Sequence, residues 1–131
     1  MDCSAMKQIE HEEQKALIEW WEGAAQSFEA LPLHLFAIPN GGMRNIVVAK
    51  RLKAEGVRSG VPELFLAIPR GAFHGLFIEM KKPSGGVVSK SQKEYHKILL
   101  KQNYQVVVCN GFVEAKQTIC SYLSEKKTTL F

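Results

Sequence analysis

The fold of this chain is decided by two stretches of sequence, Pro62-Glu63-Leu64-Phe65-Leu66-Ala67-Ile68 and Gly75-Leu76-Phe77-Ile78-Glu79-Met80-Lys81. Each joins an apolar run to a carboxylate, and the second ends in Glu-x-Lys. The turn sequence between them, Pro69 to Ala72, predicts a β-hairpin with strands over 63–68 and 74–80. Because successive side chains of a strand alternate between its faces, Glu79 and Lys81 are predicted to share one face.

Helices and strands alternate on both sides of this hairpin. Apolar residues at helical spacing predict four helices, and short apolar runs predict two further strands. The helices are expected over 7–30, 43–55, 90–102 and 112–124, and the strands over 33–38 and 104–109. The order α-β-α-β-β-α-β-α predicts an α/β fold in which helices flank a mixed sheet.

The last strand and the helix before it are expected to pack inside the fold. Because that helix connects it to the second hairpin strand, the two strands are predicted to be parallel. Tyr104 to Cys109 is an apolar run typical of a buried central strand. In the helix, Tyr95, Ile98 and Leu99 are expected to face inward.

The composition indicates one domain over 1–131. The 131 residues suit a single core, expected over about 7–124, with a frayed tail at 125–131. No apolar stretch reaches the roughly 18 residues of a membrane span, and the acidic N-terminus does not resemble an export signal. Cys3, Cys109 and Cys120 lack the spacing of a zinc site. A reducing cytoplasm is the expected compartment.

Charge is distributed unevenly along the chain. Residues 1–30 carry a net charge of −5 and residues 31–131 a net charge of +9. A basic body of this kind suits a polyanionic partner such as DNA, although a solvated basic surface explains the same composition.

The two carboxylates and the lysine of the hairpin predict a catalytic site. Glu63 and Glu79 are expected at one edge of the sheet, where they repel each other unless a cation lies between them. Carboxylate oxygens suit Mg²⁺ or Mn²⁺, and such an ion can activate water for attack on a phosphate. Lys81 would orient that water or offset charge in the transition state. The alternative is a cross-strand ion pair between Glu79 and Lys81 on a solvent face.

Several basic residues are candidates for DNA contacts. Two interpretations are open for the loop Asn40-Gly41-Gly42, which Arg44 follows. It could bind a phosphate through its backbone amides and Arg44, or it could be a simple turn. Arg58 lies close to Glu63 in sequence and could hold a phosphate beside it. The other candidates, each also explained as a surface charge, are Arg70, Lys82, Lys90 and Lys93. The four histidines show no metal-ligand spacing and are interpreted as structural.

The segments 57–63 and 75–81 together resemble the VRR-NUC domain, a branch of the PD-(D/E)xK nucleases. The resemblance runs from about Glu10 to Val113. It includes Val57-Arg58, a Val-Arg pair that is part of the family's name. It implies a Mg²⁺- or Mn²⁺-dependent endonuclease that acts on DNA. The family has aspartate where this chain has Glu63, which places the carboxylate one methylene further from the backbone.

The resemblance also implies roles for residues outside the hairpin. The family takes a metal ligand from its first helix, for which Glu10, Glu12 and Glu13 are candidates and Glu10 is preferred. The backbone carbonyl of Met80 would be a further ligand beside Glu63 and Glu79. Gln92 would contact the water or a phosphate, unless it is an ordinary surface glutamine.

Small stand-alone proteins of this kind resemble phage nucleases that cut branched DNA, such as four-way junctions, as homodimers. A phage protein would act in the cytoplasm of a bacterial host. The alternative function is a non-catalytic DNA-binding module, or one that requires a partner, on a nuclease fold.

Overall fold

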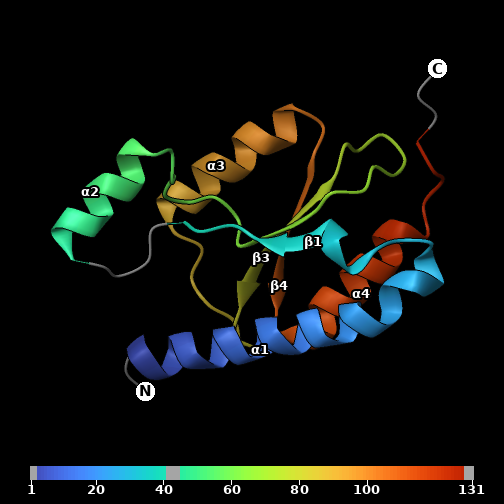
Figure 1. The fold of residues 1–131 in the computed structure, drawn as a ribbon, viewed down its shortest axis with the longest axis horizontal. Coiled ribbons are helices and arrows are strands. Elements are labelled where there is room, and N and C mark those ends of the chain that lie inside the picture. Colours follow the sequence, from blue (N-terminus) through green and yellow to red (C-terminus); the bar gives the residue numbers. More distant parts are fainter. Residues whose placement is uncertain (1–2, 41–44, 129–131) are drawn as a thin grey trace.

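A four-stranded mixed sheet lies between two layers of helices (Figure 1). The structure is a computed structural model that describes residues 3–40 and 45–128. The helices are α1 (Cys3–Ala24), α2 (Ile46–Ala54), α3 (Lys90–Lys101) and α4 (Phe112–Leu123), with two short 3₁₀ helices at Ala25–Phe28 and Pro32–His34. The strands are β1 (Leu35–Ala37), β2 (Leu64–Leu66), β3 (Leu76–Lys81) and β4 (Gln105–Asn110). The predicted fold class and element order are therefore confirmed.

The strands follow the order β1-β2-β3-β4 across the sheet. β2 pairs antiparallel with both β1 and β3, as expected for the hairpin. β4 pairs parallel with β3, so the predicted crossover through α3 is confirmed. β1 is shorter than predicted because Pro32 begins a 3₁₀ turn that takes the first residues of the expected strand.

Each face of β3 packs against a different layer. Leu76, Ile78 and Met80 join Leu17 and Trp21 of α1 and Ile119 of α4 in the main core. The alternate residues, Phe77, Glu79 and Lys81, lie on the face that α3 covers. Phe77 stacks on Phe65 at 4.3 Å between ring centroids and meets Tyr104 edge-on. All six residues of β3 are buried as a result, including its two charged side chains.

Three predictions about packing are wrong. β4 is an edge strand rather than a central one, and its apolar run is explained by cover from α3 on one face and α4 on the other. Ile98 of α3 is 58% exposed. The tail is not frayed at 125–128, because the Gly71 amide donates to the Lys126 carbonyl and Lys127 forms an ion pair with Glu29 at 2.8 Å.

In the part of the chain that the structure describes, no helix is both long and apolar enough to cross a bilayer.

Candidate active site

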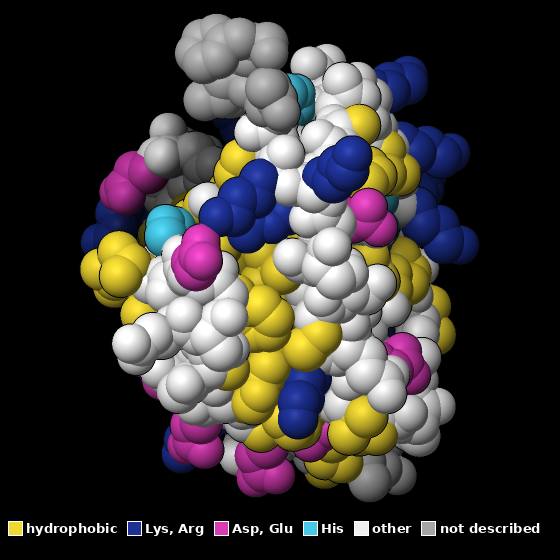
Figure 2. All heavy atoms as spheres, turned by 90° about the vertical axis from the view of Figure 1, so that its right-hand side faces the viewer, with side chains coloured by type: hydrophobic (Ala, Val, Ile, Leu, Met, Phe, Trp, Pro, Cys, Tyr) yellow, Lys and Arg dark blue, Asp and Glu magenta, His cyan; other side chains and the backbone are white. Residues whose placement is uncertain are grey.

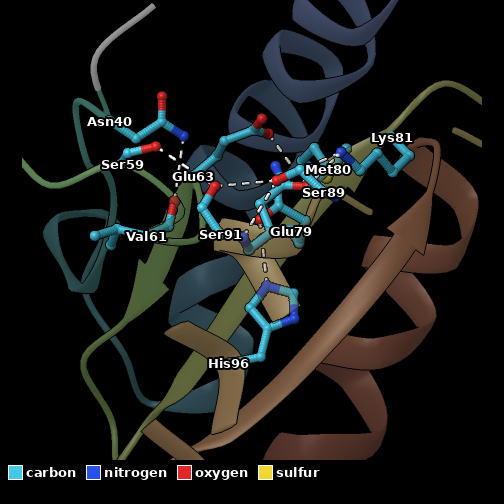
Figure 3. Close-up of polar contacts among 11 residues, drawn as sticks. Asn40, Ser59, Val61, Glu63, Glu79, Met80, Lys81, Ser89, Ser91 and His96 are labelled. Atoms are coloured by element: carbon cyan, nitrogen blue, oxygen red, sulfur yellow. Dashed lines mark hydrogen bonds and ion pairs between the residues drawn. The ribbon is translucent and has the colours of Figure 1, made fainter. Parts of the chain in front are cut away.

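The two predicted carboxylates meet at one end of the sheet. Leu64 of β2 pairs with Ile78 of β3, so Glu63, one residue before β2, lies opposite Glu79. The Met80 amide donates to Glu63 Oε2 at 3.2 Å and holds that carboxylate beside the strand. Figure 3 shows Glu63, Glu79 and Met80 gathered in this way. The hairpin register therefore positions the pair, as the sequence predicted.

Burial makes these carboxylates unusual acids. Glu79 has no exposed surface. Desolvation first, and then the charge of Glu63, raise its pKa to about 8. The pKa of Glu63 is also raised, first by burial and then by the charge of Glu10. Two carboxylates this close together repel each other unless a positive charge lies between them. Such a pair favours a positive charge between its oxygens.

Lys81 lies on the same face of β3 as Glu79, as predicted. Its Nζ is 4.0 Å from Glu79 Oε2 and donates a hydrogen bond of 3.2 Å to Gln92 Oε1. The Lys81 side chain is 9% exposed, so this is not the solvent-face ion pair of the alternative interpretation. A buried ammonium beside a carboxylate pair provides both a hydrogen-bond donor and a fixed charge at the site.

Gln92 connects the strand to the first turn of α3. Its Oε1 accepts from Lys81 Nζ and, at 2.8 Å, from the Ser89 amide, while its Nε2 donates to Glu79 Oε2 at 3.1 Å. Ser89 Oγ in turn accepts from the Gln92 amide at 3.2 Å, which completes a capping box. Gln92 is therefore part of the site and not a surface glutamine.

The loop before β2 packs tightly on the same helix end. Gly60 has a φ of +88°, and a Cβ atom at this position would lie 2.4 Å from the Ser91 carbonyl oxygen. Only glycine allows this approach. The contact fixes the segment that leads into Glu63 against the turn that carries Gln92.

His96 is a residue of the site that the sequence interpretation missed. Its Nε2 lies 3.4 Å from Glu79 Oε1, so the second carboxylate oxygen also has a partner on α3 (Figure 3). Burial, and then the charge of Lys81, lower the pKa of His96. The available signal was its position four residues after Gln92, which places both side chains on one helical face.

The glutamates of α1 have different environments. Glu10 raises the pKa of both Glu63 and Glu79 by its charge, so it lies within electrostatic reach of the pair. Glu13 Oε1 instead accepts from the Phe112 amide at 3.0 Å, at the first turn of α4. Glu12 is exposed and bonds Gln8. Of the three candidates, the structure brings only Glu10 toward the site.

The predicted DNA-contacting residues do not all lie near the carboxylates. Arg58 is exposed, and its neighbour Ser59 bonds Ser91 at the start of α3. Lys82, half-buried, follows Lys81 directly, and Lys90 and Lys93 are exposed in the first turn of α3. Arg70 is 8% exposed at the hairpin end of the sheet, where its guanidinium bonds the Pro69 carbonyl. We therefore leave Arg70 out of the DNA path. Arg44 lies outside the described residues.

The oxygen atoms of the site fit a divalent cation that keeps several water molecules as ligands. Among the described residues, no three His, Cys, Asp or Glu side chains lie close enough together to enclose a metal ion. Mg²⁺, however, is held in proteins by one or two carboxylates together with water and phosphate oxygens. Glu63 and Glu79 supply such a pair. The Met80 carbonyl faces the same side of the strand as the Met80 amide that bonds Glu63.

A cavity of about 590 Å³ lies elsewhere, between β4, α4 and the hairpin turn, and its lining includes Phe73, Val107 and Tyr122. None of the catalytic candidates lines it. The carboxylate cluster, and not this cavity, is therefore the candidate active site.

Comparison with known proteins identifies the family of this chain. Residues 8–113 match the VRR-NUC domain family. A solved structure described as a VRR_NUC domain protein superposes with a TM-score of 0.77 and 32% sequence identity, over 90% of each chain. No match was found among proteins with curated descriptions. The chain therefore belongs to the VRR-NUC domain family and carries a nuclease domain.

Proposed function

We propose that this protein is a divalent-metal-dependent endodeoxyribonuclease that hydrolyses phosphodiester bonds of branched DNA. The observation that carries the proposal is the buried network in which Glu63, Glu79, Lys81 and Gln92 are joined at one end of the sheet. A decayed nuclease fold would have no reason to keep Glu79 and Lys81 buried beside the half-buried Glu63, because desolvation of these groups opposes folding. The arrangement Glu63, Glu79 and Lys81 also supports membership of the PD-(D/E)xK nucleases.

The roles of the residues follow from their contacts. Glu63 and Glu79, with the Met80 carbonyl and with Glu10 nearby, would hold Mg²⁺ or Mn²⁺, which acts as a Lewis acid on a phosphoryl oxygen. Lys81 would hold the attacking water by a hydrogen bond and offset negative charge as the water oxygen bonds phosphorus and the bond to the leaving sugar oxygen breaks. Gln92 and His96 keep the Glu79 carboxylate in one orientation, and Gln92 does the same for Lys81.

DNA as the substrate follows from the nuclease family, and the basic body of the chain supports it. Lys82 follows Lys81, Arg58 precedes Ser59, which bonds Ser91, and Lys90 and Lys93 lie in the first turn of α3. We propose that these four residues contact phosphates next to the cleaved bond. We further propose a homodimer, because two symmetry-related sites would cut two strands of a branched substrate in matched positions. A phage protein in a bacterial cytoplasm would be one setting for this activity.

The test compares cleavage of single-stranded, duplex, flap and four-way-junction DNA in Mg²⁺, Mn²⁺ and EDTA. We expect cleavage that requires the metal and is fastest on a branched substrate. Lys81→Ala and Glu79→Gln should each lower the rate by about 10²- to 10⁴-fold. Lys15→Ala, on an exposed position of α1, is the matched control and should cleave like the wild type.

Full activity in both Lys81→Ala and Glu79→Gln would exclude the site. Binding without cleavage in either metal would instead favour a non-catalytic DNA-binding module or a requirement for a partner.

A further inference from the structure

The solvent face of α3 carries a row of four lysines. Lys90, Lys93, Lys97 and Lys101 are separated by three, four and four residues, a spacing that places them along one side of the helix. All four are exposed. We call this row the α3 lysine face. The opposite side of the helix carries Gln92 and His96, which contact Glu79. The row therefore begins at the active-site end of α3 and runs away from it.

Folding alone does not explain this arrangement. Neighbouring lysines three or four residues apart repel each other, and α3 contains one acidic residue, Glu94, against four lysines on this side. Lys90 and Lys93 lie in the first turn, where the helix dipole disfavours positive charge, and that turn contains no acidic residue. Among the described residues, none of the four ammonium groups takes part in an ion pair. Only Lys101, in the last turn, is placed where the dipole favours a cation.

A polyanion of regular spacing would remove this repulsion. From Lys90 to Lys101 the helix rises about 16 Å, and one DNA strand carries a phosphate about every 3.4 Å along its axis. The row therefore matches the length of roughly five nucleotides. Figure 2 shows that Lys and Arg side chains also gather along one upper edge of the molecule, the end of the view where α3 lies in Figure 1.

We propose that the α3 lysine face binds the phosphate backbone of a DNA arm that leaves the active site. The inference rests on the proposed nuclease function and extends it, because Lys97 and Lys101 lie about one and two turns beyond Lys93, the last basic residue of α3 included in that proposal. The binding is electrostatic and independent of sequence, and it gives the enzyme a fixed direction for the arm beside the cleaved bond.

The test measures DNA affinity as a function of salt in EDTA, so that cleavage does not interfere. Removing one lysine–phosphate contact should reduce the slope of log affinity against log salt by about 0.9. The slope should therefore fall by about 1.8 in Lys97→Gln/Lys101→Gln and by about 3.6 when all four lysines are changed. The matched control, with the same change of charge on exposed residues elsewhere, replaces Lys7, Lys15, Lys116 and Lys126. It should keep the wild-type slope.

Thermal unfolding shows whether the variants fold. We expect the variant with all four α3 lysines changed to be as stable as the wild type or more stable, because it removes repulsion within the helix. A wild-type salt slope in Lys97→Gln/Lys101→Gln, or an equal decrease in the control, would overturn the proposal. If no metal supports cleavage but the slope still falls as expected, the nuclease function fails while the DNA-binding face stands.

Discussion

At the scale of single residues, Gln92 connects three parts of the site. It bonds Glu79, Lys81 and the Ser89 amide, so one side chain fixes a carboxylate, an ammonium and a helix end. Gln92→Ala should reduce cleavage by about 10- to 100-fold, the usual effect of removing a group that orients a metal ligand. Cleavage assays and thermal unfolding measure the two effects separately.

Ser89→Ala is the control for this prediction. It removes the Oγ cap, at a cost of about 1 kcal/mol in stability, and leaves the Gln92 side-chain amide in place. We expect it to cleave DNA at close to the wild-type rate at a temperature where it is folded. An equal decrease of cleavage in the two variants would mean that the helix end, and not the Gln92 side chain, matters.

The buried carboxylate of Glu79 should make the metal-free protein sensitive to pH. Its pKa in the folded state is raised to about 8, from 4.5 in the unfolded chain. The folded state therefore holds a proton that the unfolded state loses, and this stabilisation is complete below pH 4.5 and is lost as the pH rises toward 8. One such proton changes the free energy of unfolding by up to about 1.4 kcal/mol per pH unit.

Urea unfolding in EDTA across this range measures the effect. Stability should fall as the pH rises, and Glu79→Gln, which keeps the shape of the side chain without its charge, should flatten the dependence. A profile with the same slope in Glu79→Gln would show that other groups are responsible.

At the scale of elements, two glutamates of α1 have different surroundings. The charge of Glu10 raises the pKa of Glu63. Glu13 instead accepts a hydrogen bond from the Phe112 amide and so joins α1 to the start of α4. Gly111, with a φ of +92°, leaves room there, since a Cβ atom would lie 2.8 Å from Glu13 Oε1.

Substitutions at the two positions should have opposite effects. Glu10→Gln should lower cleavage with little change in stability, because it removes a charge beside the metal site. Glu13→Ala should destabilise the fold by about 1–3 kcal/mol, because it leaves a partly buried amide without its partner, and should cleave normally when folded. The reverse pattern would make Glu13 the ligand from α1.

The elements also show what the sequence could predict. The hairpin was predictable because two apolar runs flank a turn, and its register then placed Glu63 opposite Glu79. The position of β4 in the sheet was not predictable. A strand that helices cover on both faces has the same apolar run whether it lies at the edge or at the centre of the sheet. On α3 the prediction was wrong for Ile98, which is exposed, whereas Tyr95 and Leu99 are partly buried as predicted. The polar residues Gln92 and His96, which contact Glu79, were not predicted from the apolar spacing.

At the scale of the whole molecule, a metal ion held by the carboxylate pair would make stability depend on that metal. Any ion that binds the folded state alone stabilises it, by about 2.7 kcal/mol when its concentration is 100 times its Kd. For a chain of this length that corresponds to a rise in Tm on the order of 10 °C. A cation between Glu63 and Glu79 would also relieve the repulsion that helps to raise the pKa of Glu79.

We therefore expect Mn²⁺ or Mg²⁺ to raise the Tm of the wild type, and more so at pH 8 than at pH 6, because protons compete with the metal for the carboxylates.

Glu79→Gln and Glu63→Gln should fold but show little metal-dependent shift in Tm. Lys81→Ala should keep the Tm shift or enlarge it, because it removes a positive charge 4.0 Å from Glu79, although it lowers the cleavage rate. This difference separates metal binding from the chemical step. Equal shifts in wild type and Glu79→Gln would place the metal elsewhere and remove the physical basis of the proposed reaction.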